Sequence, residues 1–418
     1  MSPPIHYNAG HDVSSGYLTL TLRMTMNRFT HFAVWMLFAS AVPAYCTAAA
    51  NDIAGHLKTL RAVGPKGAGN VEATKAWAAL SKQPAASLPE ILAGMDGAGR
   101  LAQNWIRSVA DTIAERQLAA KGELPVKQLE ALSLDRSHSP RARRIAFEWL
   151  TRVDKTTPQR LLPKMLDDPS LELRRDAVAR VIAESVKLSK TAPAGKATEV
   201  SYRKALAAAR DADQVKSCVE ALRKMNRKVD LPTHYGFLTH WKLIGPFDNR
   251  GKKGFGVAYP PEKKIDLATS HKGKKGDVRW SETATGDDYG VVDLNKVIGK
   301  HMGAIVYATT EFDSEKGGEV DVRLGCINGN KVWVNGQLLT ANEVYHANTS
   351  VDQYRATTTL KPGKNIVLIK VCQNEQTESW AQRWQFQLRI CDEIGTAVLS
   401  TDRPPTPKKP PAKEKKKK

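Results

Sequence analysis

The sequence predicts an α+β multidomain protein in which an N-terminal α-solenoid precedes an antiparallel jelly-roll β-sandwich. Three observations support this prediction. Apolar residues recur at spacings of three and four residues between 51 and 230, where alanine is abundant. Glycine, asparagine, threonine, valine and tryptophan become more frequent from 231 to 400. In that second segment, short alternating stretches are separated by turn residues, as strands of a sandwich require.

Residues 1–50 contain a predicted secretory signal peptide. Arg28 provides a positive charge, an apolar run follows at 32–42, and small residues precede 51. The apolar run is too short to span a bilayer well. We expect translation to start at Met24 or Met26, with the upstream residues misassigned; the alternative for the apolar run is a buried N-terminal helix. The signal peptide predicts that the protein is secreted or periplasmic.

The segment 51–230 is predicted to form pairs of amphipathic helices. Each pair joins two helices through a turn rich in Asp, Ser, Gly or Pro, and the pairs cover 88–115, 129–154, 161–185 and 206–226. One such pair cannot bury its apolar stripe alone, so stacked neighbours would complete the core and leave a curved surface. This organisation favours binding over chemistry.

An internal register supports the repeat. Residues 141–147 lie 31 positions before 172–178, so that Arg143 matches Arg174 and Arg144 matches Arg175. The stretch "LLPKMLDDPSLELRRDAVARVI", with its Asp-Asp-Pro turn, resembles a HEAT repeat. These arginines could contact a partner; the alternative is that they are solvated or pair with nearby acids.

The segment 231–400 is predicted to contain eight strands. Asn335-Gly336 between "KVWV" and "QLL" indicates a hairpin. Alternation in "RWQFQLRI" places Trp384, Phe386, Leu388 and Ile390 on one face. The expected strands are 238–243, 304–311, 320–324, 331–334, 337–339, 354–360, 365–372 and 384–390.

The order of motifs in this segment resembles a galactose-binding-like domain. The motifs are "WKLIGPFDN…GFGVAYPPE", "YATTEF", "VDVRLGCINGNKVWVNGQLL" and "LKPGKNIVLIKVCQNEQTESWAQRWQFQLRI". The sugar-binding domain of family 2 glycoside hydrolases carries a comparable hairpin, and similar modules occur in secreted proteins of planctomycete-type bacteria. The resemblance implies a sandwich that binds carbohydrate. Related sequences often place Ser and acidic residues where this chain has 325–329, which puts a ligand role for that loop in doubt.

The loop "GKKGFG" at 251–256 invites a phosphate-binding interpretation. A phosphate-binding loop requires the order G-x-x-x-x-G-K-[ST], which this stretch lacks. We therefore interpret its glycines as turn residues that follow the first strand.

Four residues are candidates for ligand binding. Trp380 lies between two expected strands with Arg383 nearby, and Tyr345 and His346 lie in another loop. Exposed aromatic rings in end loops can stack on sugar rings; packing against the sandwich is the alternative. Asp287 and Asp288 in "TGDDYG" could donate oxygens to Ca²⁺, or could form an ordinary turn; no other cofactor is expected.

The cysteines leave two interpretations open. Cys372 and Cys391 lie at the ends of two expected strands, where they could form a disulfide if those strands were neighbours. Otherwise these residues, with Cys218 and Cys326, are buried free thiols.

The formal net charge of +20 could attract nucleic acid, anionic polysaccharide or a membrane surface. Seven lysines follow Pro404, and the Pro/Lys composition of 401–418 predicts a disordered tail that could bind an anionic polymer. Behind a signal peptide, nucleic acid is not expected.

The sequence as a whole predicts an exported, non-catalytic binding protein. The G-x-S-x-G nucleophile motif and the H-E-x-x-H metalloprotease motif are absent from it. The expected ligand is carbohydrate or a protein of the cell envelope, recognised through the sandwich and the solenoid surface. The alternatives are a structural scaffold that binds no sugar and an accessory subunit of a polysaccharide-degrading enzyme.

Overall fold

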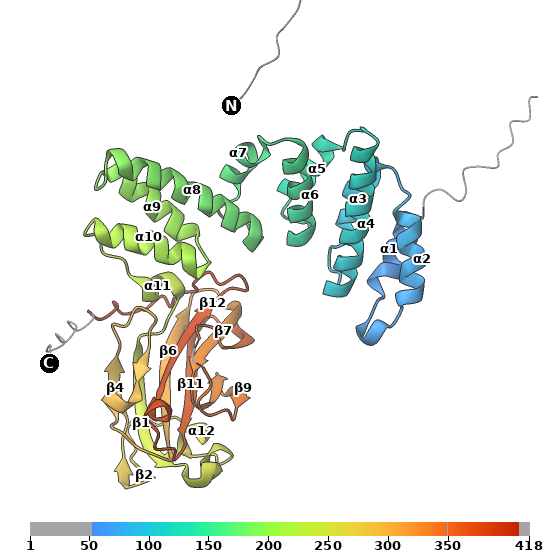
Figure 1. Cartoon of the computed structure of the whole chain (residues 1–418). Coiled ribbons are helices and arrows are strands. Elements are labelled where there is room, and N and C mark those ends of the chain that lie inside the picture. The colour runs from blue at the N-terminus through green and yellow to red at the C-terminus, as the bar shows by residue number, and fades with distance from the viewer. Residues whose placement is uncertain (1–51, 349, 409–418) are drawn as a thin grey trace, which may run out of the picture. The chain divides into compact units, whose positions relative to one another are not determined.

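The computed structural model describes residues 52–348 and 350–408. Within these residues, helices come first and antiparallel sheets follow, so the predicted α+β class is confirmed (Figure 1). The predicted signal peptide and all but one of the tail lysines lie outside the described residues.

Most of the described helices precede the sheets. Their bounds are α1 Ile53–Arg61, α2 Asn70–Leu80, α3 Leu88–Ala93, α4 Arg100–Ala119, α5 Val126–Leu134, α6 Pro140–Val153, α7 Thr157–Leu161, α8 Leu171–Thr191, α9 Lys196–Ala208, α10 Ala212–Lys224 and α11 Leu231–Tyr235. Two single-turn helices, α12 Pro260–Lys263 and α13 Leu294–Val297, lie among the strands. No described helix combines the length and apolar character needed to cross a membrane.

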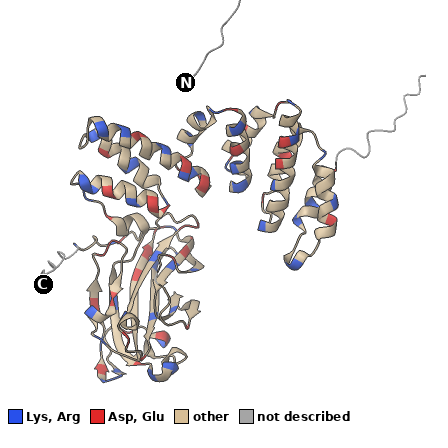
Figure 2. Cartoon of the chain, viewed as in Figure 1, with Lys and Arg blue, Asp and Glu red and all other residues tan. Residues whose placement is uncertain are grey.

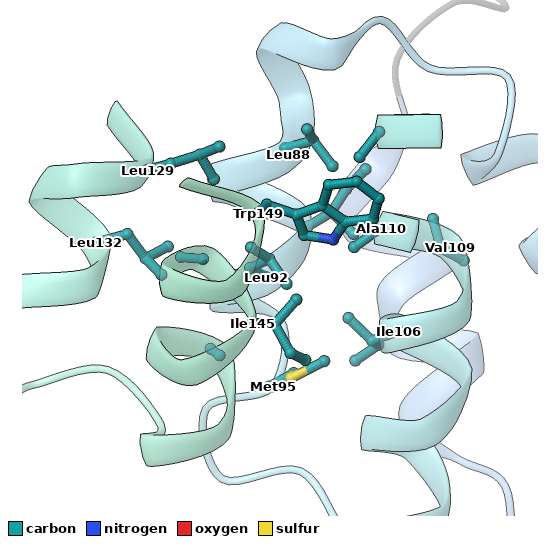
Figure 3. Close-up of a cluster of buried hydrophobic side chains, with 14 of the residues drawn as sticks. Leu88, Leu92, Met95, Ile106, Val109, Ala110, Leu129, Leu132, Ile145 and Trp149 are labelled. Carbon is teal, nitrogen blue, oxygen red and sulfur yellow. The ribbon is translucent and has the colours of Figure 1, made fainter. Parts of the chain in front are cut away.

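Helix packing follows the apolar spacing of the sequence. In α6, Ile145 and Trp149 are four residues apart and therefore lie on one face. That face packs in a continuous buried cluster with residues of α3, α4 and α5 (Figure 3). The cluster includes Leu88, Leu92, Met95, Ile106, Val109, Ala110, Leu129 and Leu132.

Arg144 and Arg175, which the 31-residue register aligns, make equivalent contacts. Arg144 of α6 forms an ion pair with Asp176 of α8, and Arg175 of α8 forms an ion pair with Asp213 of α10. In each case a basic residue contacts an acidic residue on a helix further along the chain. Basic and acidic residues are interspersed along the helices (Figure 2). These two arginines therefore pair with nearby acids, which was one of the two interpretations.

The strands form two main sheets and one small ribbon. Their bounds are β1 His240–Asp248, β2 His271–Gly273, β3 Gly276–Val278, β4 Ser281–Ala284, β5 Val292–Asp293, β6 Ala304–Ser314, β7 Gly318–Cys326, β8 Gly329–Val334, β9 Gln337–Asn342, β10 Tyr354–Leu360, β11 Gly363–Gln373 and β12 Gln385–Cys391. One sheet has the order β4-β1-β6-β11-β8-β9, the other has β10-β7-β12-β5, and β2 pairs with β3.

A single buried cluster lies between the two main sheets. Trp384, Phe386, Leu388 and Ile390 all belong to it, which confirms the alternation predicted around β12. The hairpin at Asn335-Gly336 is also confirmed, because φ is 50° and 81° at these two residues, as the two central positions of a type I′ turn require. The eight expected strands correspond to β1 and β6–β12.

The cysteines are free and buried. Cys372 lies on β11 of the six-stranded sheet, whereas Cys391 lies on β12 of the four-stranded sheet. The premise that their strands are neighbours is therefore wrong. Burial raises the pKa of the Cys326 and Cys372 thiols to about 12.

The first residues of the Pro/Lys segment contact the rest of the chain. The backbone N–H of Thr401 donates to the carbonyl of Asp313 at 3.0 Å, and the hydroxyl of Thr406 donates to the carboxylate of Asp230 at 3.0 Å. The disorder predicted for the lysine run beyond these residues falls outside the described part of the chain.

Candidate functional site

Several loops meet at one end of the two sheets. Strand register places Asp248, at the end of β1, opposite Ala304, at the start of β6, which also pairs with Gln373 at the end of β11. Cys372 pairs in turn with Gly329 at the start of β8. The loops that follow β1, β9 and β11 therefore emerge together, and we call this region the loop end.

Three of the four sequence-predicted ligand residues converge at the loop end. Trp380 lies in a 3₁₀ turn, Ser379–Gln382, between β11 and β12, while Tyr345 and His346 follow β9. The rings of His346 and Trp380 meet edge to face, with centroids 5.3 Å apart. Trp380 is 57% exposed although this contact holds its ring. An exposed indole fixed from one side is suited to stacking against a ligand.

His346 is held from its other side by Asn374. The distance from His346 Nε2 to Asn374 Oδ1 is 2.8 Å, and the same Oδ1 accepts the backbone N–H of Gln376. Because Oδ1 acts as the acceptor, Nε2 of the imidazole is the donor. Asn374 is buried, so the amide, the imidazole and the indole form one chain from the interior to the surface.

Tyr345 is anchored by a residue that the sequence did not single out. The side-chain amide of buried Asn249 donates to the Tyr345 hydroxyl at 3.1 Å and to the carbonyl of Gln373 at 3.0 Å. Burial raises the pKa of the Tyr345 phenol to about 12. Tyr345 is therefore a neutral, partly buried support beside His346.

Arg383 does not join this cluster through its side chain. Its carbonyl accepts the side-chain amide of Asn328 at 3.1 Å, whereas the guanidinium is exposed. The backbone of Arg383 thus fixes the start of β12.

The "GKKGFG" loop belongs to the same end of the sheets. It forms a 3₁₀ segment, Arg250–Phe255, and the backbone N–H of Gly251 donates to the Glu375 carboxylate at 2.7 Å. Gly251 and Lys252 both have positive φ, 61° and 62°. The Lys252 ammonium lies 5.2 Å from the centre of the Tyr345 ring. An exposed cation therefore stands next to the aromatic residues.

A buried lysine fixes the position of this loop. Lys370 of β11 is fully buried, and its ammonium donates to the carbonyls of Phe255 and Val257 and to the Glu262 carboxylate at 3.0, 2.8 and 2.8 Å. The Tyr307 hydroxyl donates to the same carboxylate. Burial lowers the pKa of Lys370, and the ion pair with Glu262 opposes that effect. The loop is thus bound to the outer face of the six-stranded sheet.

The calcium candidates have protein partners. Asp287 accepts the backbone N–H of Tyr289 at 2.9 Å, as an Asp in a turn does. Asp288 forms an ion pair with Arg223 at 2.8 Å. Among the described residues, no group of three or more His, Cys, Asp or Glu side chains could hold a metal ion.

Sequence reasoning found the aromatic residues of the loop end and missed their supports. Asn249, Asn374 and Glu375 carry no local signal, because each is an ordinary polar residue next to a strand. The unusual Gly/Lys composition of its loop is the one sequence signal for Lys252. From the sequence, that composition is interpreted as a turn.

Comparisons with known proteins give weak matches only. No model of a known family and no curated protein matches the chain. Among solved structures it is similar to a β-glucosidase from Kluyveromyces marxianus in complex with glucose, with 10% identity, coverage of 69% of this chain and 36% of that chain, and a TM-score of 0.25. An uncultured Clostridium sp. β-glucuronidase shows 13% identity, 38% and 29% coverage, and a TM-score of 0.22.

A third similar structure is an anti-sigma factor domain-containing protein from Clostridium clariflavum. It shows 12% identity, coverage of 42% of this chain and 50% of that chain, and a TM-score of 0.24. The chain spans half or less of the length of these three solved structures. TM-scores of this size do not establish a shared fold, and nothing about the function of this chain follows from them.

Proposed function

We propose that the protein is an exported, non-catalytic binding protein that recognises carbohydrate at the loop end. The observation that carries this proposal is the exposed Trp380 ring, held edge to face by His346, which is itself fixed by Asn374. The finer fold assignments, a jelly-roll sandwich of galactose-binding-like type behind HEAT-like helical repeats, are part of the same proposal.

Stacking on Trp380 would bury apolar surface on both partners. One face of a pyranose ring presents C–H groups, and an indole ring provides a large flat apolar surface for them. A ring that is already oriented loses little conformational freedom on binding, so more of the contact energy remains as affinity. Lys252 and the loop amides would then supply polar contacts to hydroxyl groups.

The polar groups near Trp380 support binding rather than hydrolysis. Hydrolysis of a glycosidic bond ordinarily requires two carboxyl groups flanking that bond. At the loop end, the Glu375 carboxylate accepts the backbone N–H of Gly251, and the indole contacts the imidazole of His346, which is bonded to the amide of Asn374. An accessory role beside a polysaccharide-degrading enzyme is compatible with this arrangement.

A scaffold protein is the second candidate function. The ion pairs that link α6 to α8 and α8 to α10 favour it, because they join successive helices into one surface. In that case the helical surface would bind a protein of the cell envelope, and the lysine tail would contact an anionic polymer. Both candidates place the protein in a secreted or periplasmic location.

A glycan array probed with the full chain separates the two candidates. Carbohydrate recognition predicts saturable binding to a related group of glycans at constant ionic strength. Binding to none of the glycans would favour the scaffold. Binding that follows glycan charge alone and disappears in salt would point to the lysine tail instead.

A further inference from the structure

A small cavity lined by arginines lies away from the loop end. It has a volume of about 150 Å³ and lies between the segment around α11 and the β7, β10 and β12 strands. A water molecule occupies about 30 Å³ of liquid, so the cavity has room for a few waters or one tetrahedral oxyanion. The side chains that matter here are Arg210, His234, Tyr235, Arg323, Arg355 and Arg389.

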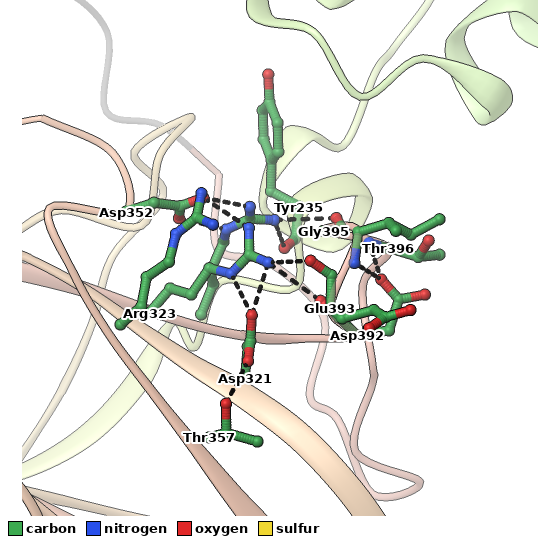
Figure 4. Close-up of polar contacts among 12 residues, drawn as sticks. Tyr235, Asp321, Arg323, Asp352, Thr357, Asp392, Glu393, Gly395 and Thr396 are labelled. Atoms are coloured by element: carbon green, nitrogen blue, oxygen red, sulfur yellow. Dashed lines mark hydrogen bonds and ion pairs between the residues drawn. The ribbon is translucent and has the colours of Figure 1, made fainter. Parts of the chain in front are cut away.

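Two of these arginines are held by carboxylates. Arg389 is 5% exposed and bonds both oxygens of Asp352, with Arg389 Nε 2.7 Å from Asp352 Oδ1. Arg323 is 4% exposed and bonds Asp352 at 3.1 Å and Asp321 at 2.7 Å (Figure 4). Asp352 therefore serves two buried guanidinium groups at once. Arg355 approaches the same carboxylate at 3.7 Å with its side chain 57% exposed.

Arg210 has neutral acceptors instead. Its Nε and Nη2 donate to the Thr396 hydroxyl at 3.2 and 3.1 Å, and its Nη1 donates to the carbonyls of Ala207 and Ala209 at 3.0 and 2.8 Å. The remaining acid that lines the cavity, Asp211, forms an ion pair with Arg175 at 3.1 Å. Four arginines thus face the cavity, and their counter-ions are Asp352, Asp321 and the nearby Asp392, which leaves an excess of positive charge.

The behaviour of neighbouring titratable groups agrees with this excess. Burial, together with the nearby Arg174 and Arg389 and against the opposing effect of Asp392, lowers the pKa of Arg210 to about 10. Burial and the charges of Arg210 and Arg389 lower the pKa of His234 to about 4. Additional positive charge, such as a proton on His234, is therefore disfavoured here, as expected where positive charge lacks a full counter-ion.

We propose that this cavity binds a tetrahedral oxyanion, phosphate or sulfate, either free or as an ester on a sugar. Arg210 and Arg355 would bind it directly, while Arg323 and Arg389 remain engaged by Asp352. The planar guanidinium fork of Arg355 matches two oxygens of such an anion, and charge-assisted hydrogen bonds of this kind are the strong ones. Arg210, whose Nε and Nη1 hydrogens are engaged by the protein, would add its charge and one Nη2 N–H. The proposal does not depend on sugar binding at Trp380.

Isothermal titration calorimetry of the full chain tests the proposal. Sodium sulfate and sodium phosphate are titrated at constant ionic strength against a sodium chloride reference, and glucose 6-sulfate provides the ester arm. We expect saturable binding of one anion per chain. Arg210→Gln should weaken the binding about tenfold or more, the size of one charge-assisted hydrogen bond. The inorganic ions and the ester separate the two sources of the ligand.

Two further variants make the result decisive. Arg355→Gln removes an exposed side chain, so it tests the cavity even if Arg210→Gln fails to fold. Arg152→Gln, which removes an exposed arginine paired with Glu115 on another helix, is the matched control and should leave binding unchanged. Absence of saturable binding, or equal affinities for the wild type, Arg210→Gln and Arg355→Gln, would overturn the proposal.

Discussion

Arg143 and Asp168 form a bidentate ion pair in the interior of the helical region, where each side chain is 1% exposed. Arg143 Nη1 donates to Asp168 Oδ1 at 2.8 Å, Nη2 donates to Oδ2, and Nε donates to the carbonyl of Ser133 at 3.1 Å. Asp168 also accepts the backbone N–H of Ser170, the residue that caps α8. The pair therefore joins α6 to the turn that starts α8.

Breaking this pair should destabilise the protein strongly. Asp168→Asn would leave the Arg143 charge buried without its counter-ion, which typically costs about 3–5 kcal/mol. Equilibrium unfolding in urea measures the loss. The adjacent Asp167→Asn is the matched control, because the Asp167 side chain is 75% exposed and its pair with Arg136 should be worth about 1 kcal/mol or less. Similar losses for both variants would contradict this account.

Glu262 should control the order of the "GKKGFG" loop. In Glu262→Gln the Lys370 ammonium loses its carboxylate, and the network that binds Phe255 and Val257 to the sheet weakens. Amide hydrogen exchange at 250–263 should become about tenfold faster or more, which corresponds to about 1.4 kcal/mol of local stability. Lys263→Gln, a change at an exposed neighbour, should leave exchange as in the wild type. Unchanged exchange in Glu262→Gln would show that Lys370 does not anchor the loop.

His234 should make stability depend on pH between about 4 and 6.5. Its pKa is about 4 in the folded chain and returns to its usual 6.5 on unfolding, so the unfolded chain holds the extra proton in this window. The stability contributed by neutral His234 is fully present above pH 6.5 and is lost as the pH falls toward 4. One pKa unit corresponds to about 1.4 kcal/mol, so the loss should reach a few kcal/mol.

The comparison with His234→Gln isolates this effect from the other acid groups. The variant cannot take up the proton, so its free energy of unfolding should fall less steeply between pH 6.5 and pH 4 than that of the wild type. Parallel pH profiles for the two proteins would show that His234 titrates normally in the folded state.

The four cysteines of the described region should react as thiols after unfolding and resist reaction before it. Burial raises the pKa of Cys218 and Cys391 to about 11 and that of Cys326 and Cys372 to about 12, so all four carry little reactive thiolate near neutral pH. Alkylation in denaturant without reductant, followed by peptide mass spectrometry, should find all four modified. If Cys372 and Cys391 are modified only after reduction, they form a disulfide and the strand placement is wrong.

Local patterns in the sequence predicted much of this fold. Alternation identified β12, the Asn-Gly pair identified the hairpin at 335–336, and the internal register equated Arg144 with Arg175, which do make equivalent ion pairs. The strand and the hairpin depend on residues close together in the sequence, and the equivalent ion pairs depend on a pattern that repeats after 31 residues. The short strands β2–β5 were missed because their two to four residues are too few to show alternation.

Features that depend on tertiary contacts could not be predicted in the same way. A lysine in a strand ordinarily indicates a solvent-facing position, yet Lys370 is buried because the loop after β1 folds over it. The candidate site shows the same limit. Trp380, Tyr345 and His346 were chosen as exposed loop aromatics, and only strand register brings them together and adds Asn249 and Asn374 to the cluster.

The affinity of the Trp380→Ala variant for a glycan selected on the array is the most direct test of carbohydrate recognition at the loop end. Truncation to alanine removes the ring on which the sugar would stack. The affinity should therefore fall at least about tenfold, which corresponds to about 1.4 kcal/mol. Tyr289→Ala, at an aromatic residue that is 42% exposed outside the loop end, is the control and should bind normally. Trp380→Ala should unfold near the wild-type temperature. Wild-type affinity in Trp380→Ala would contradict the account.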